Sequence, residues 1–166
     1  MRHFTSVTVL NDGGSSTNIN GFVFDSCTHL EAVSPTNITK LAAGGASGTG
    51  YSNFSRTALT RIELPSIREL GNYIGVGINA DFIFGASLSS VAQYSFRNMN
   101  NANRYANYII LATTPPTLAS GTLATNNMGG YIYVPDEAYE EYTINNATWS
   151  VIKSKIKRLS EWSGSL

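Results

Sequence analysis

Three segments of this chain align with one another at a spacing of 29 residues. Each segment contains a leucine that is followed, three residues later, by valine or isoleucine. The leucines are Leu30, Leu59 and Leu88, and the β-branched residues are Val33, Ile62 and Val91. A fixed period of about 20–50 residues is typical of stacked structural units, each too small to bury an apolar face alone. The spacing therefore predicts an array of stacked repeats.

In such an array, the leucine and the β-branched residue of each unit point inward and pack on the equivalent residues of the neighbouring units. Each unit adds one strand to a continuous parallel sheet on one side of the array. A loop or short helical turn is expected to close the other side. The pattern therefore predicts a β-rich solenoid in which positions such as 61 and 63 face solvent.

After the repeats, the sequence predicts two further strands and a helical cap. Residues 108–112 and 131–134 are apolar runs bounded by turn residues. Pro135 is followed by two acidic residues, which suits the first turn of a helix. A second short helix is expected around Trp149, and residues 156–162 are expected to be extended.

Several strings in the chain resemble BspA-type leucine-rich-repeat proteins. Residues 24–33, Phe-Asp-Ser-Cys-Thr-His-Leu-Glu-Ala-Val, resemble the repeat F-x-x-C-x-x-L-x-x-V of that family. Residues 54–65 fit the same unit, with Arg56 at the position of Cys27. The closing cap of these arrays, as found in gut Bacteroidetes and their phages, is similar to residues 113–118, 132–137 and 156–162.

The resemblance covers about residues 20–162. It implies a β-rich α/β solenoid, namely a short right-handed leucine-rich-repeat array with a C-terminal helical cap. It also implies a role in adhesion or recognition at surfaces. We expect a single domain over residues 1–166, with repeats in 1–112 and the C-terminal strands and helical cap in 113–166.

The charge composition argues against a nucleic-acid partner. Eleven basic and eleven acidic residues give a net charge of zero, and only 13% of residues are charged, against about a quarter in typical proteins. Proteins that bind nucleic acid usually carry a clustered basic excess.

One cysteine cannot form an internal disulfide. The sequence has neither a signal-peptide pattern nor an apolar stretch long enough to insert in a membrane. The family resemblance, and not the composition, implies an extracellular, cell-surface or virion location.

The candidates for catalysis and metal binding are weak. Cys27 and His29 share one side of an extended segment, but free cysteines are commonly inert and buried. The acidic residues from Asp136 to Glu141 crowd one short segment, whereas glycoside hydrolysis needs two carboxylates facing each other across a cleft. We therefore expect no enzyme, no metal site and no cofactor.

Binding is the function class that the composition favours. Nine tyrosines among abundant Asn, Ser and Gly form a palette typical of recognition surfaces. The candidate ligand-binding residues are Arg61, Glu63, Tyr105, Tyr108, Tyr131 and Tyr133. They predict a non-catalytic recognition or adhesion module for host glycan or protein, on a phage particle or bacterial envelope. Two alternatives stay open: the tyrosines pack beneath the cap, or the chain is a structural virion or assembly component without an external ligand.

The N-terminal end of the array has no polar cap in the sequence. An uncapped end leaves a strand edge and apolar surface available to another chain. We therefore expect this end to dock onto a partner or onto a second copy of the chain.

Overall fold

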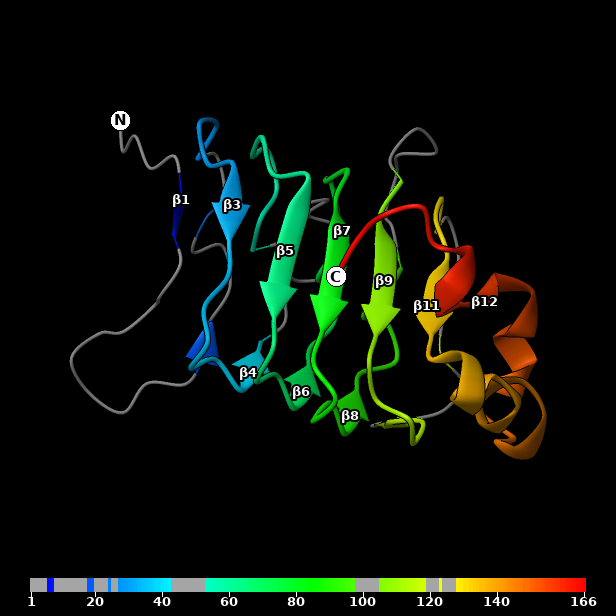
Figure 1. The fold of residues 1–166 in the computed structure, drawn as a ribbon. Coiled ribbons are helices and arrows are strands. Elements are labelled where there is room, and N and C mark those ends of the chain that lie inside the picture. Colours follow the sequence, from blue (N-terminus) through cyan, green and yellow to red (C-terminus); the bar gives the residue numbers. More distant parts are fainter. Residues whose placement is uncertain are drawn as a thin grey trace.

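Successive strands of the chain pass alternately to two parallel β-sheets (Figure 1). The computed structural model describes residues 6–7, 18–19, 24, 27–42, 53–97, 105–118, 123 and 128–166, with residues 6–7 described by their backbone alone. Within these residues the first sheet has seven strands and the second has five. The strands of each sheet pair in parallel, because each turn of the chain returns to the same side in the same direction.

The first sheet contains, in spatial order, β1 (Ser6–Val7), β3 (Ala32–Val33), β5 (Arg61–Leu64), β7 (Asp81–Phe84), β9 (Asn107–Ile110), β11 (Ile132–Val134) and β12 (Ile156–Arg158). The second sheet contains β10 (Thr117–Leu118), β8 (Ser90–Val91), β6 (Glu69–Leu70), β4 (Lys40–Leu41) and β2 (Asn18–Ile19). Among the described strands, only the final pair, β11 and β12, follow one another within the same sheet.

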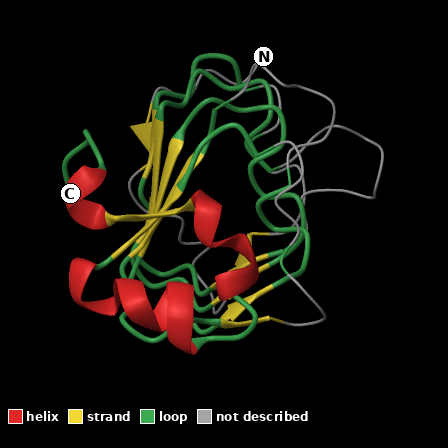
Figure 2. Ribbon diagram, turned by 90° about the vertical axis from the view of Figure 1, so that its right-hand side faces the viewer, coloured by secondary structure: helices red, strands yellow, loops and turns green. Residues whose placement is uncertain are grey.

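The interior lies between the two sheets and is filled by residues in register. In the first sheet the inward row is Val33, Ile62, Phe82, Tyr108, Ile132 and Ile156. In the second sheet it is Ile19, Leu41, Leu70, Val91 and Leu118. Figure 2 shows the sheets bounding the interior on two sides and stacked turns bounding it on the third. One backbone hydrogen bond between those turns joins Ile74 N–H to the Ser95 carbonyl at 3.1 Å.

Aromatic rings run through this interior. The Phe54 ring lies 5.6 Å from Phe24 and 6.1 Å from Phe82, measured between centroids. Phe82 in turn lies 5.4 Å from Tyr108, which also packs 4.3 Å from Phe96. Aromatic pairs at such distances add to the stabilisation from buried area. The rings therefore connect successive turns of the chain to one another.

The predicted fold class, a leucine-rich-repeat solenoid with one sheet and a helical cap, is wrong. The structure instead has two parallel sheets and few helices, and strands occupy the side expected to hold loops or helical turns. The physical reason is that the same apolar spacing precedes strands of both sheets. Val91, aligned with Ile62 by the 29-residue spacing, pairs with Leu70 in the second sheet. Ile62 is paired with Phe82, only 20 residues further along.

The C-terminal segment is helical where the two helices were predicted, but its helices are short and are largely of 3₁₀ or π type. These are the 3₁₀ helices η1 (Asp136–Ala138), η3 (Ser150–Lys155) and η4 (Leu159–Glu161), and the single-turn π-helix η2 (Glu141–Asn145). The Tyr142 hydroxyl donates a hydrogen bond to the Ala112 carbonyl, and the Trp149 indole donates one to the Pro116 carbonyl, each at 2.8 Å. These buried bonds fix the segment against the end of both sheets.

Candidate recognition surface

The outer face of the first sheet carries two rows of side chains in register. The first row is Arg61, Asp81 and Asn107, and the second is Glu63, Ile83, Ile109, Tyr133 and Lys157. Residues two apart on a strand point to the same face, so both rows belong to the face opposite the interior. This face therefore joins charged groups on β5 to apolar groups on β7, β9 and β11.

A second apolar cluster lies on this outer face. Ile83, Ile109, Tyr133 and Trp162 form its buried part, and Leu111 and Leu159 pack against it. We call this set the outer cluster. Trp162 follows η4 and is 9% exposed. Its indole N–H donates a hydrogen bond to Asp81 Oδ2 at 3.1 Å, and Asp81 Oδ1 accepts one from the Asn107 amide at 2.8 Å.

Residues 163–166, the tail, continue from Trp162 across the outer face (Figure 1). The Arg61 guanidinium donates a hydrogen bond to the Ser165 carbonyl and lies 6.0 Å from the Trp162 ring. Leu166 lines a pocket of about 210 Å³, whose apolar walls include Ile83 and Leu111. The tail therefore occupies the part of the outer face that Arg61 and Glu63 were predicted to offer to a ligand.

Tyr131 lies close to two lysines at the end of the sheet. The Lys157 ammonium is 4.1 Å from the centroid of the Tyr131 ring, and the Lys155 ammonium is 5.7 Å from it. We call Tyr131, Lys155 and Lys157 the tyrosine–lysine cluster. The register Ile132–Ile156 produces it, because the residues that flank each isoleucine then point outward on adjacent strands.

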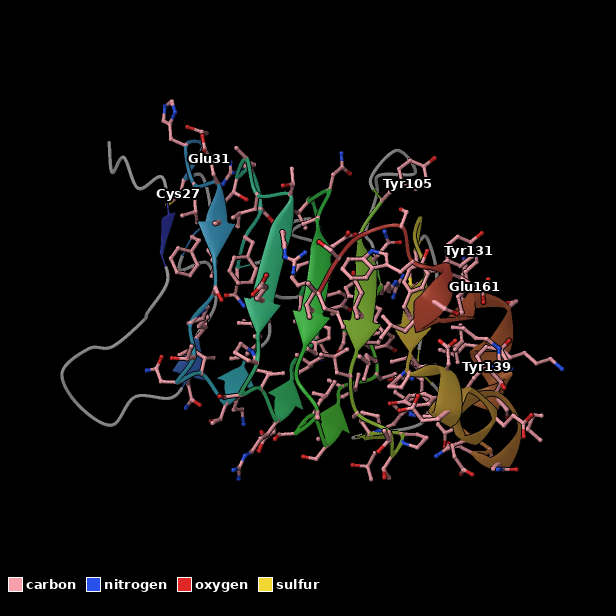
Figure 3. The ribbon with its side chains drawn as sticks, viewed as in Figure 1. Cys27, Glu31, Tyr105, Tyr131, Tyr139 and Glu161 are labelled. Carbon is pink, nitrogen blue, oxygen red and sulfur yellow. The ribbon has the colours of Figure 1, made fainter. Side chains whose placement is uncertain are left out.

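The six predicted site residues fall into three environments. Tyr105 and Tyr131 are exposed, at 61% and 36%, near the points where β9 and β11 begin (Figure 3). Arg61 and Glu63 form an ion pair of 2.5 Å beside the tail. Tyr108 and Tyr133 are buried, Tyr108 in the interior and Tyr133 in the outer cluster. The structure therefore does not gather the six residues into one surface.

The pKa values of the buried tyrosines reflect these positions. Burial raises the pKa of Tyr108 far above that of a free phenol. The pKa of Tyr133 is raised first by burial and then by the nearby Asp81 carboxylate. In both cases the neutral phenol is favoured, which suits a packing role.

Sequence reasoning missed the residues that complete this face, namely Lys155, Lys157 and Trp162. A signal for the two lysines was present, since they alternate with Ile156 in the pattern of a strand with one buried side. No local signal indicates that Trp162 packs against Asp81, which lies 81 residues earlier in the sequence.

The other candidate groups lie apart from this surface. Cys27 is a half-buried free thiol that packs against the interior. The acidic residues after Pro135 lie on short turns, where Asp136, Glu137, Glu140 and Glu141 are all exposed. Among the described residues, no three His, Cys, Asp or Glu side chains are grouped so as to hold a metal ion. No helix of the described part is both long and apolar enough to cross a membrane.

Comparison with known proteins does not assign the chain to a family. A scan against protein-family models finds no match, and a search of curated proteins finds no match either.

Proposed function

We propose that this chain is a non-catalytic recognition module that binds a glycan or protein at a cell surface. The observation that carries the proposal is the exposure of two tyrosines, Tyr105 and Tyr131, near the starts of β9 and β11, together with the Lys155 and Lys157 ammonium groups beside the Tyr131 ring. Tyrosine supplies rigid contact area at low cost in conformational entropy, and the half-buried Lys155 and Lys157 supply charge. Strands and hydrogen bonds to asparagine hold both tyrosines in place.

In both hydrogen bonds the backbone N–H of the tyrosine donates to the side-chain oxygen of an asparagine. The Tyr105 N–H donates to Asn79 Oδ1 at 2.9 Å, and the Tyr131 N–H donates to Asn107 Oδ1 at 3.1 Å. Anchored backbone lowers the entropy lost when a ligand binds, which favours affinity. A site on a phage particle or bacterial envelope is part of the proposal, and it rests on the resemblance of the repeat and cap strings.

The test is binding of the labelled chain to intact gut Bacteroidetes cells, with and without their capsular polysaccharide. The variant Tyr105→Ala/Tyr131→Ala should lose most of the cell-bound signal. Tyr139→Ala is the matched control, because Tyr139 is also a partly exposed tyrosine beside a cation, 4.4 Å from Arg158, but lies on the turn after β11 (Figure 3). Equal loss in both variants, or no binding by the folded chain, would contradict the proposal.

A structural role in an assembly is the second candidate. It is favoured because four of the predicted site residues contact other parts of this chain. Tyr108 and Tyr133 are buried, while Arg61 and Glu63 lie against the tail. A folded chain that binds no cell surface but associates with other components of its own particle would support this second candidate.

A further inference from the structure

We propose that the tyrosine–lysine cluster selects glycans that carry carboxylate groups, such as polymers of uronic acids. The inference rests on the proposed recognition function and names the ligand class for the same end of the sheet. It starts from the position of two ammonium groups close to one aromatic ring.

The geometry of the cluster leaves donors free for a ligand. Lys155 donates one hydrogen bond to the Met128 carbonyl at 2.9 Å. An ammonium has three donors, so this bond leaves two. The Lys157 ammonium forms no hydrogen bond and no ion pair with any residue that the structure describes. Its contact is with the Tyr131 ring, an attraction that holds the ammonium near the aromatic face without neutralising it.

The two carboxylates that raise the pKa of Tyr133, those of Asp81 and Glu161, are hydrogen-bonded to other groups. Glu161 accepts a hydrogen bond from the Arg158 backbone N–H at 3.0 Å and so caps the N-terminus of η4. Both oxygens of Asp81 accept hydrogen bonds, one from Asn107 and one from Trp162. The positive charge of Lys155 and Lys157 is therefore not balanced by an ion pair within the described part of the chain.

A carboxylated sugar fits this arrangement better than a neutral sugar or a nucleic acid. The ring of a sugar offers an apolar face of C–H groups to an aromatic ring, and a uronate carboxylate on the same ring can reach an ammonium beside it. Two lysines are too few for a phosphate backbone in a chain whose net charge is zero. Exposed ion pairs are individually weak, so a polymer that presents many copies gains most from repeated contacts.

The experiment measures binding of purified chain to three uronate polymers, hyaluronate, alginate and polygalacturonate, in low salt. Each polymer is compared with its carboxyl-reduced form, which keeps the chain of sugars but removes the charge. We expect at least one uronate polymer to bind and its reduced form to bind at least about tenfold more weakly, with binding falling as salt rises.

The variant Lys155→Ala/Lys157→Ala should weaken uronate binding by about tenfold. The matched control is Lys153→Ala/Arg68→Ala, which removes the same charge from two exposed cations outside the cluster. Thermal unfolding checks that both variants fold. An equal loss in the two double variants would overturn the inference.

The outcomes separate the inference from the proposed function. Equal binding of native and reduced polymers, or binding to cells and neutral glycans but to no uronate, overturns the carboxylate selectivity and leaves the recognition module standing. Binding to no polymer and to no cell overturns both.

Discussion

The inner and outer faces of the first sheet are both apolar along β7, β9 and β11, but they are covered in different ways. The inner residues, such as Phe82 and Tyr108, pack against the second sheet and against the connecting segments between strands. Both are close in sequence to the strands that they cover, because the chain passes alternately to the two sheets. The outer residues, such as Ile83 and Ile109, are covered by Trp162 and Leu159 from the C-terminal segment. One face is therefore buried by neighbours in sequence, and the other by a single remote segment.

The burial patterns along the strands reflect this difference. β5 alternates between half-buried and buried residues, as expected for a strand with one solvated face. In β7 and β9 the last three residues are buried without interruption. A continuous apolar run is typical of a strand covered on both sides. The lesson is that a change from alternation to a continuous run marks where a second layer begins, even when the covering segment lies far away.

The largest effect should come from the inner face. Phe82→Ala removes a fully buried ring that stacks on Tyr108 and meets the Phe54 ring edge to face. We expect the free energy of unfolding to fall by about 3–5 kcal/mol, because both the transfer energy and the cavity left behind are unfavourable. Denaturant titration measures it. The control Ile144→Ala, at a side chain that is 68% exposed, should change stability by less than about 0.5 kcal/mol. Similar values for the two variants would contradict the assignment of Phe82 to the core.

An intermediate effect should come from the outer face. Trp162→Ala should lower the free energy of unfolding by about 2 kcal/mol, below the range for large core aromatics, because its ring lies in the small outer cluster and not in the interior between the sheets. Hydrogen exchange should show increased exposure of β7 and β9 at Ile83 and Ile109, with the second sheet unchanged.

Trp162→Phe separates the two contributions of this side chain. It keeps an aromatic ring in the outer cluster but removes the hydrogen bond to Asp81. We expect this variant to lose about 1 kcal/mol, the net value of one such bond. If Trp162→Phe is as destabilising as Trp162→Ala, the hydrogen bond rather than apolar burial holds the C-terminal segment.

The smallest effect should come from the tail. A Cβ atom on Gly164 would overlap the Trp162 ring, so Gly164→Ala forces the tail to turn away from the indole. We expect a loss of less than about 1 kcal/mol, because the residues that move are exposed. The hydrogen bond from Arg61 to the Ser165 carbonyl should be lost, while the Phe82 amide stays protected from hydrogen exchange.

The NMR chemical shift of the Trp162 indole N–H measures the change, and Ser163→Ala is the control. An unchanged indole signal in Gly164→Ala would show that the tail does not pack as described.

The sequence predicted parallel strands with an inward apolar row, and Leu30, Leu59 and Leu88 are all buried. It did not distinguish the two sheets, because the spacing Leu-x-x-Val describes entry into either one. Prediction of the site was partial for the same kind of reason. Exposure of Tyr105 and Tyr131 follows from local alternation, whereas burial of Tyr133 depends on Trp162, which reaches it only through the fold. The prediction that the N-terminal end docks onto a partner concerns residues that lie mostly outside the described part of the chain.

The position of Trp162 has a consequence for the order of events during synthesis. Chains fold from the N-terminus as they emerge, and the pairings among β5, β7 and β9 need no residue beyond 110. The outer cluster, by contrast, cannot close until Trp162 has been made. Over that interval Ile83 and Ile109 stand uncovered on strands that can already pair, a period in which the nascent chain is most exposed to aggregation and most in need of a chaperone.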